Sequence, residues 1–121
     1  MISVIMSVFN EKIDWIKQSV QSILNQTYAN LEFIIVIDNP NVDKSVLLYL
    51  NGLPHIDSRV KILMNEKNVG LAISLNRALA VATGELIARM DADDISEIDR
   101  LEKEIKYLMN HKLDIWSCVK I

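Results

Sequence analysis

The sequence predicts an α/β domain built on a mostly parallel sheet with helices on both faces. Apolar runs of strand length alternate with stretches in which apolar residues recur every three or four positions. The strand-like runs are nearly continuous, as in strands that are covered on both faces. The chain has 121 residues, of which 50% are hydrophobic, and this suits a single folded domain.

The first half of the chain opens with a strand, a helix and a second strand. A nearly continuous apolar run predicts the first strand over 3–9. The helix that follows has one apolar face, formed by Ile13, Ile16, Val20, Ile23 and Leu24. A run of β-branched and aromatic residues predicts the second strand over 31–37. The composition of Asp38-Asn39-Pro40-Asn41 predicts a loop after it.

A short helix and a third strand come next. The helix is expected over 43–50 and is ended by Asn51-Gly52-Leu53-Pro54. The third strand is expected over 60–64. A third helix follows Gly70 and ends at Gly84, with an apolar face formed by Leu71, Leu75, Leu79 and Ala82.

The last part of the chain repeats the alternation. We expect a fourth strand over 85–90, broken by an acidic stretch. The fourth helix begins with a capping-box-like Ser96-x-x-Asp99, and its apolar positions are Ile98, Leu101, Ile105 and Leu108. A fifth strand is expected over 114–119, and it would need cover from a further element.

Composition and charge exclude several classes of protein. A net charge of −3 leaves no dense basic face for the phosphates of a nucleic acid. The single cysteine, Cys118, forms no internal disulfide, and with two distant histidines it makes no zinc-ligand spacing. The three glycines match neither a Walker A loop nor a dinucleotide fingerprint. We expect no signal peptide and no transmembrane segment, since no apolar run approaches the ~18–20 residues of a span.

Polar side chains follow the predicted strands at their carboxyl ends, where ligands bind in open parallel sheets. Glu11 follows the first strand, Asp38 the second and Asn65 the third, while Asp91-Ala92-Asp93-Asp94 follows the fourth. Three carboxylates this close repel one another unless a cation lies among them. Oxygen ligands favour Mn²⁺ or Mg²⁺, and substrate phosphates commonly complete the shell of Mg²⁺. The pattern therefore predicts a divalent cation and a nucleoside diphosphate.

Each of these residues also has a purely structural interpretation. Asp94 would cap the following helix, with the other acids solvated in a loop. Asp38 would be a turn residue before Asn39-Pro40. Arg77 would form a surface ion pair rather than offset phosphate charge. The residues alone leave these alternatives open.

Five segments, in order along nearly the whole chain, resemble the family 2 glycosyltransferases, which have the GT-A fold. They are 3–11 (opening strand), 22–28 (end of the first helix), 33–38 (second strand with its acidic end), 65–71 (loop before the third helix) and 88–101 (the DXD segment). The last resembles the subgroup that builds exopolysaccharide, capsule and lipopolysaccharide chains. The chain departs from the family in having Ser7 where proline is frequent, and Ile37-Asp38 where two acids are common.

The resemblance implies roles for individual residues. Asp93 would be the metal ligand that holds the diphosphate through Mn²⁺ or Mg²⁺, with Asp91 contacting ribose or sugar and available as a second ligand. Asp38 would accept a hydrogen bond from the base, usually uracil. The full set implied to bind the donor is Ser7, Phe9, Glu11, Asp38, Asn76, Arg77 and Asp91.

The resemblance also implies an activity: inverting, metal-dependent transfer of a sugar, UDP-linked in the donor, to a glycan or lipid-linked acceptor in surface polysaccharide synthesis. Residues 1–121 would be the donor-binding part of a GT-A domain, inactive alone, with the general base and acceptor-binding segment beyond residue 121. The enzyme would lie in the cytoplasm or associate with the inner face of the membrane. The alternative is a non-catalytic Mg²⁺-binding module similar to a phospho-receiver domain.

Overall fold

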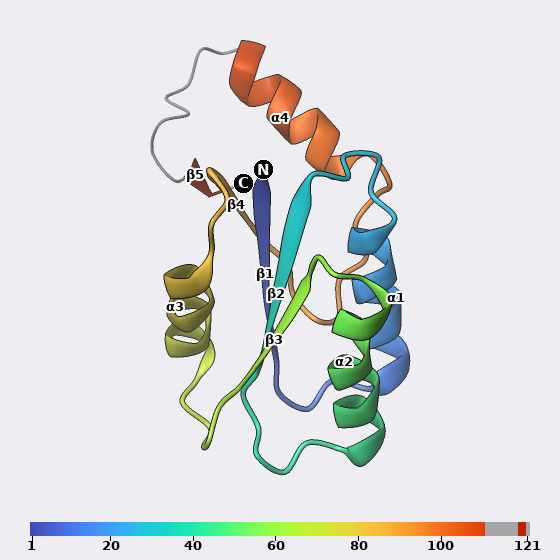
Figure 1. Ribbon diagram of the computed structural model, residues 1–121, viewed down its shortest axis with the longest axis vertical. Helices are drawn as coiled ribbons and strands as arrows, with labels where there is room; N and C mark the ends of the chain where they lie inside the picture. The colour runs from blue at the N-terminus through green and yellow to red at the C-terminus, as the bar shows by residue number, and fades with distance from the viewer. Residues whose placement is uncertain (111–118, 121) are drawn as a thin grey trace.

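One five-stranded sheet, in the order β3-β2-β1-β4-β5, organises the computed structural model (Figure 1). The structure describes residues 1–110 and 119–120. The elements follow one another as β1 (Ile2–Val8), α1 (Ile13–Leu24), β2 (Leu31–Ile37), α2 (Lys44–Ile56), β3 (Val60–Met64), α3 (Leu71–Val81), β4 (Leu86–Arg89), α4 (Arg100–Asn110) and β5 (Val119–Lys120). The described strand pairings are parallel. The predicted α/β class is confirmed, and β2 and β3 have the predicted bounds.

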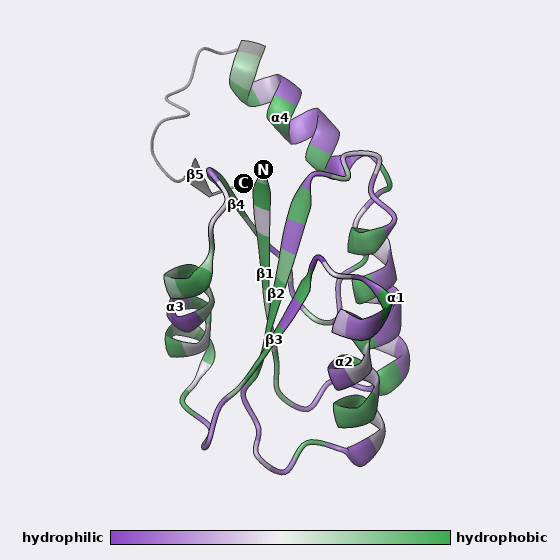
Figure 2. Cartoon of the chain, in the orientation of Figure 1, coloured by the Kyte–Doolittle hydropathy of each residue, from purple (hydrophilic) through white to green (hydrophobic). Residues whose placement is uncertain are grey.

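Helices cover both faces of the sheet, and strand side chains alternate between these faces. Figure 1 shows α1 and α2 together on one face and α3 on the other. Val4 and Met6 of β1 belong to the core under α1 and α2, whereas Ile5 packs with Ala78 of α3. Figure 2 shows that β1 and much of β2 are hydrophobic, as strands with two covered faces require.

Helix α2 is longer than predicted, and the expected end at 51–54 is wrong. Gly52 and Pro54 lie inside the helix, which continues to Ile56. Leu50 and Leu53 are buried in the core beneath it, with exposed fractions of 0% and 2%. Pro54 stands in the last turns, where its missing N–H removes a single helical hydrogen bond. Burial of the two leucines therefore outweighs local signals that favour an earlier end.

Helix α3 packs on the sheet through a face that only partly matches the predicted one, since Leu75 and Ala82 are the predicted residues that pack against the core. Its buried residues are the small Ser74 and Ala78. Leu71 and Leu79, from the predicted apolar face, are 48% and 41% exposed. Small side chains allow the helix to lie close to the strands, and Leu71 and Leu79 are left at the side of the contact.

Two glycines have distinct backbone roles. Gly70 precedes α3 with φ of 93°, a conformation that side chains other than glycine rarely adopt. Gly84 does not end α3, contrary to the prediction, because the helix stops at Val81. A Cβ atom on Gly84 would lie 2.5 Å from Ser3 Oγ, so glycine is needed there for close approach to β1.

The predicted capping box at the start of α4 is also wrong. The helix begins at Arg100, and the backbone N–H of Ser96 donates instead to Ser22 Oγ of α1, at 3.0 Å. The first turn is capped from outside, since the Leu101 N–H donates to Gln26 Oε1 at 3.1 Å. A side chain 75 positions earlier in the sequence thus does what Ser96 was expected to do.

Strand β5 pairs with β4, with Val119 opposite Leu86. The rest of the predicted fifth strand, with Trp116 and Cys118, lies outside the described residues. Within 1–110 and 119–120, we find no helix with the length and apolar character that crossing a bilayer demands.

Candidate functional site

The ends of β1, β2 and β3 meet at the carboxyl edge of the sheet. The Asp38 N–H donates to the Val8 carbonyl at 2.8 Å, and the Asn65 N–H donates to the Ile37 carbonyl at 2.9 Å. Asn39 crosses back to the first strand, where its side-chain amide donates to the Phe9 carbonyl at 3.0 Å. Polar residues after three strands are therefore neighbours, as the parallel arrangement predicts.

Asp38 is buried at this edge and already has protein partners. Its Oδ1 accepts hydrogen bonds from the Asn65 side chain at 2.9 Å and the Val69 N–H at 2.8 Å. Its Oδ2 accepts one from the Gly70 N–H at 2.9 Å. The side chain is 3% exposed. Burial raises the pKa of Asp38, but these hydrogen bonds and one from Ser74 outweigh it, so the pKa lies below its ordinary value of 3.8.

Asn65 and Arg77 complete a network around the loop that precedes α3. The Asn65 side chain donates to Ser74 Oγ at 3.0 Å as well as to Asp38. Arg77 donates to Asn65 Oδ1 and to the Met64 carbonyl. Within the described residues, Arg77 thus hydrogen-bonds to the end of β3 and to Asn65 rather than forming the surface ion pair considered from the sequence. The network ties the loop 65–70 to the end of β2 and to α3.

The acidic stretch after β4 brings three carboxylates together. Asp91, Asp93 and Asp94 each offer an oxygen within 4.8 Å of the others, and the three side chains are exposed. Asp91 pairs with Arg89 at 3.4 Å. Between the acids, Ala92 is 2% exposed and belongs to the core under α1. The donor set, carboxylate oxygens only, fits a hard divalent cation such as Mn²⁺ or Mg²⁺.

The end of β1 carries three of the predicted donor-binding residues. Ser7 is half-buried in the strand, opposite Val36 of β2, and Phe9 is 42% exposed just after it. The Phe9 N–H donates to Glu11 Oε1 at 2.8 Å, so this carboxylate closes the turn that leaves the strand. The turn leaves the phenyl ring of Phe9 at the surface of the carboxyl edge.

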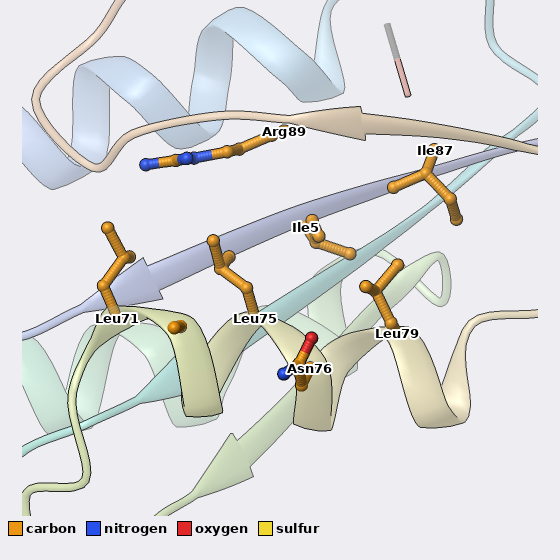
Figure 3. Close-up of a pocket in the computed structure, with 8 residues that line it drawn as sticks. Ile5, Leu71, Leu75, Asn76, Leu79, Ile87 and Arg89 are labelled. Atoms are coloured by element: carbon orange, nitrogen blue, oxygen red, sulfur yellow. The ribbon is translucent and has the colours of Figure 1, made fainter. Parts of the chain in front are cut away.

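A largely apolar groove of about 680 Å³ lies between α3 and the sheet (Figure 3). Its walls are Ile5 and Ile87 from the strands and Leu71, Ala72, Leu75, Asn76 and Leu79 from α3, with Arg89 beside them. Figure 3 shows Arg89 extended along the groove toward the end of β1. Asn76 lines this groove, whereas Arg77 contacts the end of β3. The two residues were both predicted to bind the donor, but their side chains lie in different places.

Sequence reasoning missed several residues of this edge. Arg89 pairs with Asp91, Ser19 of α1 contacts the acidic stretch, and Gln26, just after α1, contacts Glu97 beyond that stretch. Ser19 did carry a signal, because it lies on the same helix face as Ile16, Val20 and Ile23, where a polar residue is unexpected. Arg89 carried none, since a charged residue at the end of a strand is ordinary.

Solved structures share this architecture. A mannosyltransferase of Pyrobaculum calidifontis, solved with GDP-Man and Mn²⁺, is 25% identical, with a TM-score of 0.77 over 88% of this chain and 32% of its own. TarS of S. aureus, residues 1–349 solved with UDP-GlcNAc, is 23% identical, with a TM-score of 0.79 over 92% of this chain and 32% of its own. The similarity to TarS supports the fold.

Curated relatives show closer sequence similarity. An uncharacterized glycosyltransferase of Methanocaldococcus jannaschii is 41% identical over 93% of this chain and 38% of its own length. The Escherichia coli UDP-Glc:alpha-D-GlcNAc-diphosphoundecaprenol beta-1,3-glucosyltransferase WfgD is 36% identical over 93% of this chain and 43% of its own. The chain spans about two fifths of the length of these relatives. Residues 3–120 match glycosyl transferase family 2, and the chain therefore belongs to this family.

Proposed function

We propose that this chain forms the donor-binding part of an inverting, metal-dependent glycosyltransferase. The donor is a nucleotide-sugar, with UDP as the nucleotide, and the acceptor is a glycan or a lipid-linked sugar in surface polysaccharide synthesis. The observation that carries the proposal is the group of three carboxylates at the end of β4, with oxygens within 4.8 Å of one another beside the carboxyl edge of the sheet. Family membership favours this function over a receiver-like Mg²⁺-binding module.

The relatives support the choice of substrates. WfgD is described by its name as transferring glucose from UDP-Glc to a diphosphoundecaprenol-linked sugar. The Pyrobaculum mannosyltransferase was solved with GDP-Man and Mn²⁺, and TarS with UDP-GlcNAc. A UDP-sugar and a lipid-linked acceptor follow for this chain by analogy with WfgD. We place the enzyme in the cytoplasm, where it could also associate with the inner face of the membrane.

Asp93 is the proposed metal ligand, and Asp91 a second one. The cation would offset the negative charge that develops on the nucleoside diphosphate as it leaves the sugar. Arg89 pairs with Asp91 at 3.4 Å, which orients this carboxylate while leaving it exposed. Asp94 lies in the same group and adds negative charge that favours the cation.

The remaining donor contacts come from the ends of β1 and β2 and from α3. We assign the base and ribose to Ser7, Phe9 and Asp38, with Glu11 holding the turn beside Phe9. The exposed ring of Phe9 suits stacking against a base. Asp38 would accept a hydrogen bond from the base in addition to its four protein donors, so it shapes the loop 65–70 as well. Asn76 and Arg77 border the site from α3.

The transfer itself needs a base that takes the proton of the acceptor hydroxyl. That oxygen then forms a bond to the anomeric carbon on the face opposite the diphosphate, which leaves with the electron pair of the broken bond. The general base and the acceptor-binding segment are proposed to lie beyond residue 121.

Calorimetric titration of the chain with UDP, in Mn²⁺ and in excess chelator, tests the proposal. We expect binding with Mn²⁺ and a loss of at least tenfold in affinity with chelator, since three carboxylates otherwise oppose the diphosphate. Asp93→Asn should abolish the metal dependence. Glu85→Gln, the same chemical change at an exposed acid before β4, should leave it intact. Equal UDP affinity with and without Mn²⁺ would refute the metal role.

A further inference from the structure

The segment that carries the three carboxylates has little structure of its own. Residues 91–99 form neither helix nor strand between β4 and α4. The backbone closes on itself where the Asp94 N–H donates to the Asp91 carbonyl at 3.1 Å. Since like charges repel, a segment with three adjacent carboxylates tends to spread unless something outside holds it. In Figure 1 this segment runs beside α1.

Ser19 of α1 holds the acidic segment from beneath. The side chain is fully buried, with 0% exposed. Its hydroxyl donates to the Ala92 carbonyl at 2.8 Å and also lies within hydrogen-bonding distance of the Asp94 carbonyl. The single hydroxyl proton is therefore shared between two carbonyls. These carbonyls flank Asp93, the proposed metal ligand.

Ser22, on the same side of α1, and Gln26, just after the end of the helix, extend the contact at steps of three and four. Ser22 Oγ accepts a hydrogen bond from the Ser96 N–H at 3.0 Å. Gln26 is 5% exposed, and its side-chain amide donates to the Glu97 carbonyl at 2.6 Å. Gln26 Oε1 accepts the hydrogen bond of the Leu101 N–H at 3.1 Å, which fixes the start of α4. The segment is thus tied to α1 at its middle and at its end.

We infer that Ser19 and Ser22, with Gln26, are positioning residues for the divalent cation. They fix the backbone on both sides of Asp93, so that the carboxylate oxygens are held close together before the cation arrives. The inference rests on the proposed function, because it assigns these residues to the metal that the proposal requires. Residues that orient metal ligands without touching the metal commonly change affinity by 10–100-fold when substituted.

The test measures Mn²⁺ affinity of the 121-residue chain by electron paramagnetic resonance of free Mn²⁺, with UDP present at saturation. Ser19→Ala should weaken Mn²⁺ binding about 10-fold or more, since both carbonyls lose their donor. The matched control is Ser3→Ala, which removes another fully buried serine hydroxyl, at the amino edge of the sheet. Ser3→Ala should lower the melting temperature and leave Mn²⁺ affinity unchanged.

Ser22→Ala and Ser22→Thr cover the case in which Ser19→Ala does not fold. Ser22 is only partly buried, so alanine should be tolerated and should also weaken Mn²⁺ binding, while threonine, which keeps the hydroxyl, should restore it. If Ser19→Ala folds and binds Mn²⁺ with wild-type affinity, the inference is overturned and the proposed function stands. If Ser19→Ala is unfolded, wild-type Mn²⁺ affinity in Ser22→Ala has the same consequence. Absence of Mn²⁺ binding by the wild type would overturn both.

Discussion

Glu32 lies at the opposite edge of the sheet from the candidate site, and its charge should stabilise the fold. The side chain is 5% exposed. It accepts hydrogen bonds from Ser3 Oγ and the Thr83 N–H, both at 2.6 Å, from Lys61 Nζ at 2.9 Å and from Thr83 Oγ1 at 3.0 Å. Burial raises the pKa of Glu32, but these hydrogen bonds outweigh it and lower the pKa from 4.5 to about 2.

The size of the effect follows from this pKa. Each pH unit of difference between the folded and unfolded pKa corresponds to about 1.4 kcal/mol, so ionised Glu32 contributes about 3 kcal/mol to the free energy of unfolding. Because the folded pKa is the lower one, this contribution is complete above pH 4.5 and disappears as the pH falls to about 2. By about pH 3, roughly 2 kcal/mol of it is lost, since the unfolded chain is already protonated.

Denaturant unfolding of the wild type and Glu32→Gln, at pH 7 and pH 3, measures this contribution. Glu32→Gln should lower the free energy of unfolding by about 3 kcal/mol at pH 7 and by about 1 kcal/mol at pH 3. The difference between the two proteins isolates Glu32 from the other acids that titrate in this range. Glu85→Gln, at an exposed acid near the same edge, should change little. A destabilisation by Glu32→Gln that is equal at both pH values would show that the charge is not the cause.

Three further predictions concern the site, the backbone and activity. Asp38→Ala should weaken UDP binding by about 1–3 kcal/mol in calorimetry and keep its Mn²⁺ dependence, whereas unchanged UDP affinity would remove Asp38 from the base. Gly84→Ala should lower the melting temperature, because its Cβ would lie 2.5 Å from Ser3 Oγ; Gly52→Ala, with nothing within 4 Å of its Cβ, should be neutral or raise it. The chain alone should bind UDP-sugars yet transfer sugar negligibly to a panel of glycan acceptors, and multiple-turnover transfer would place the general base within it.

Local pattern predicted the strands well because β1, β2 and most of β4 are buried apolar runs. The bounds of β2 coincide with the prediction, and its seven residues are all buried. Helix ends were predicted less well, because turn and cap signals are weak compared with burial. Gly52 and Pro54 favoured an end to α2 that the buried Leu53 overrides. Ser96 matched a capping pattern, but its N–H is bound to Ser22 instead.

For the candidate site, too, some features follow from the sequence and others only from the tertiary structure. Sequence alone placed Asp38 and the acidic stretch at the carboxyl edge, because parallel strands end there and the acids follow the strands directly. Only the tertiary structure decided how these groups are held. Asp38 is bound by groups 27–32 positions away, and Ser19 reaches the acidic stretch across 73 positions. Such contacts depend on which elements pack together, and no local spacing of residues encodes them.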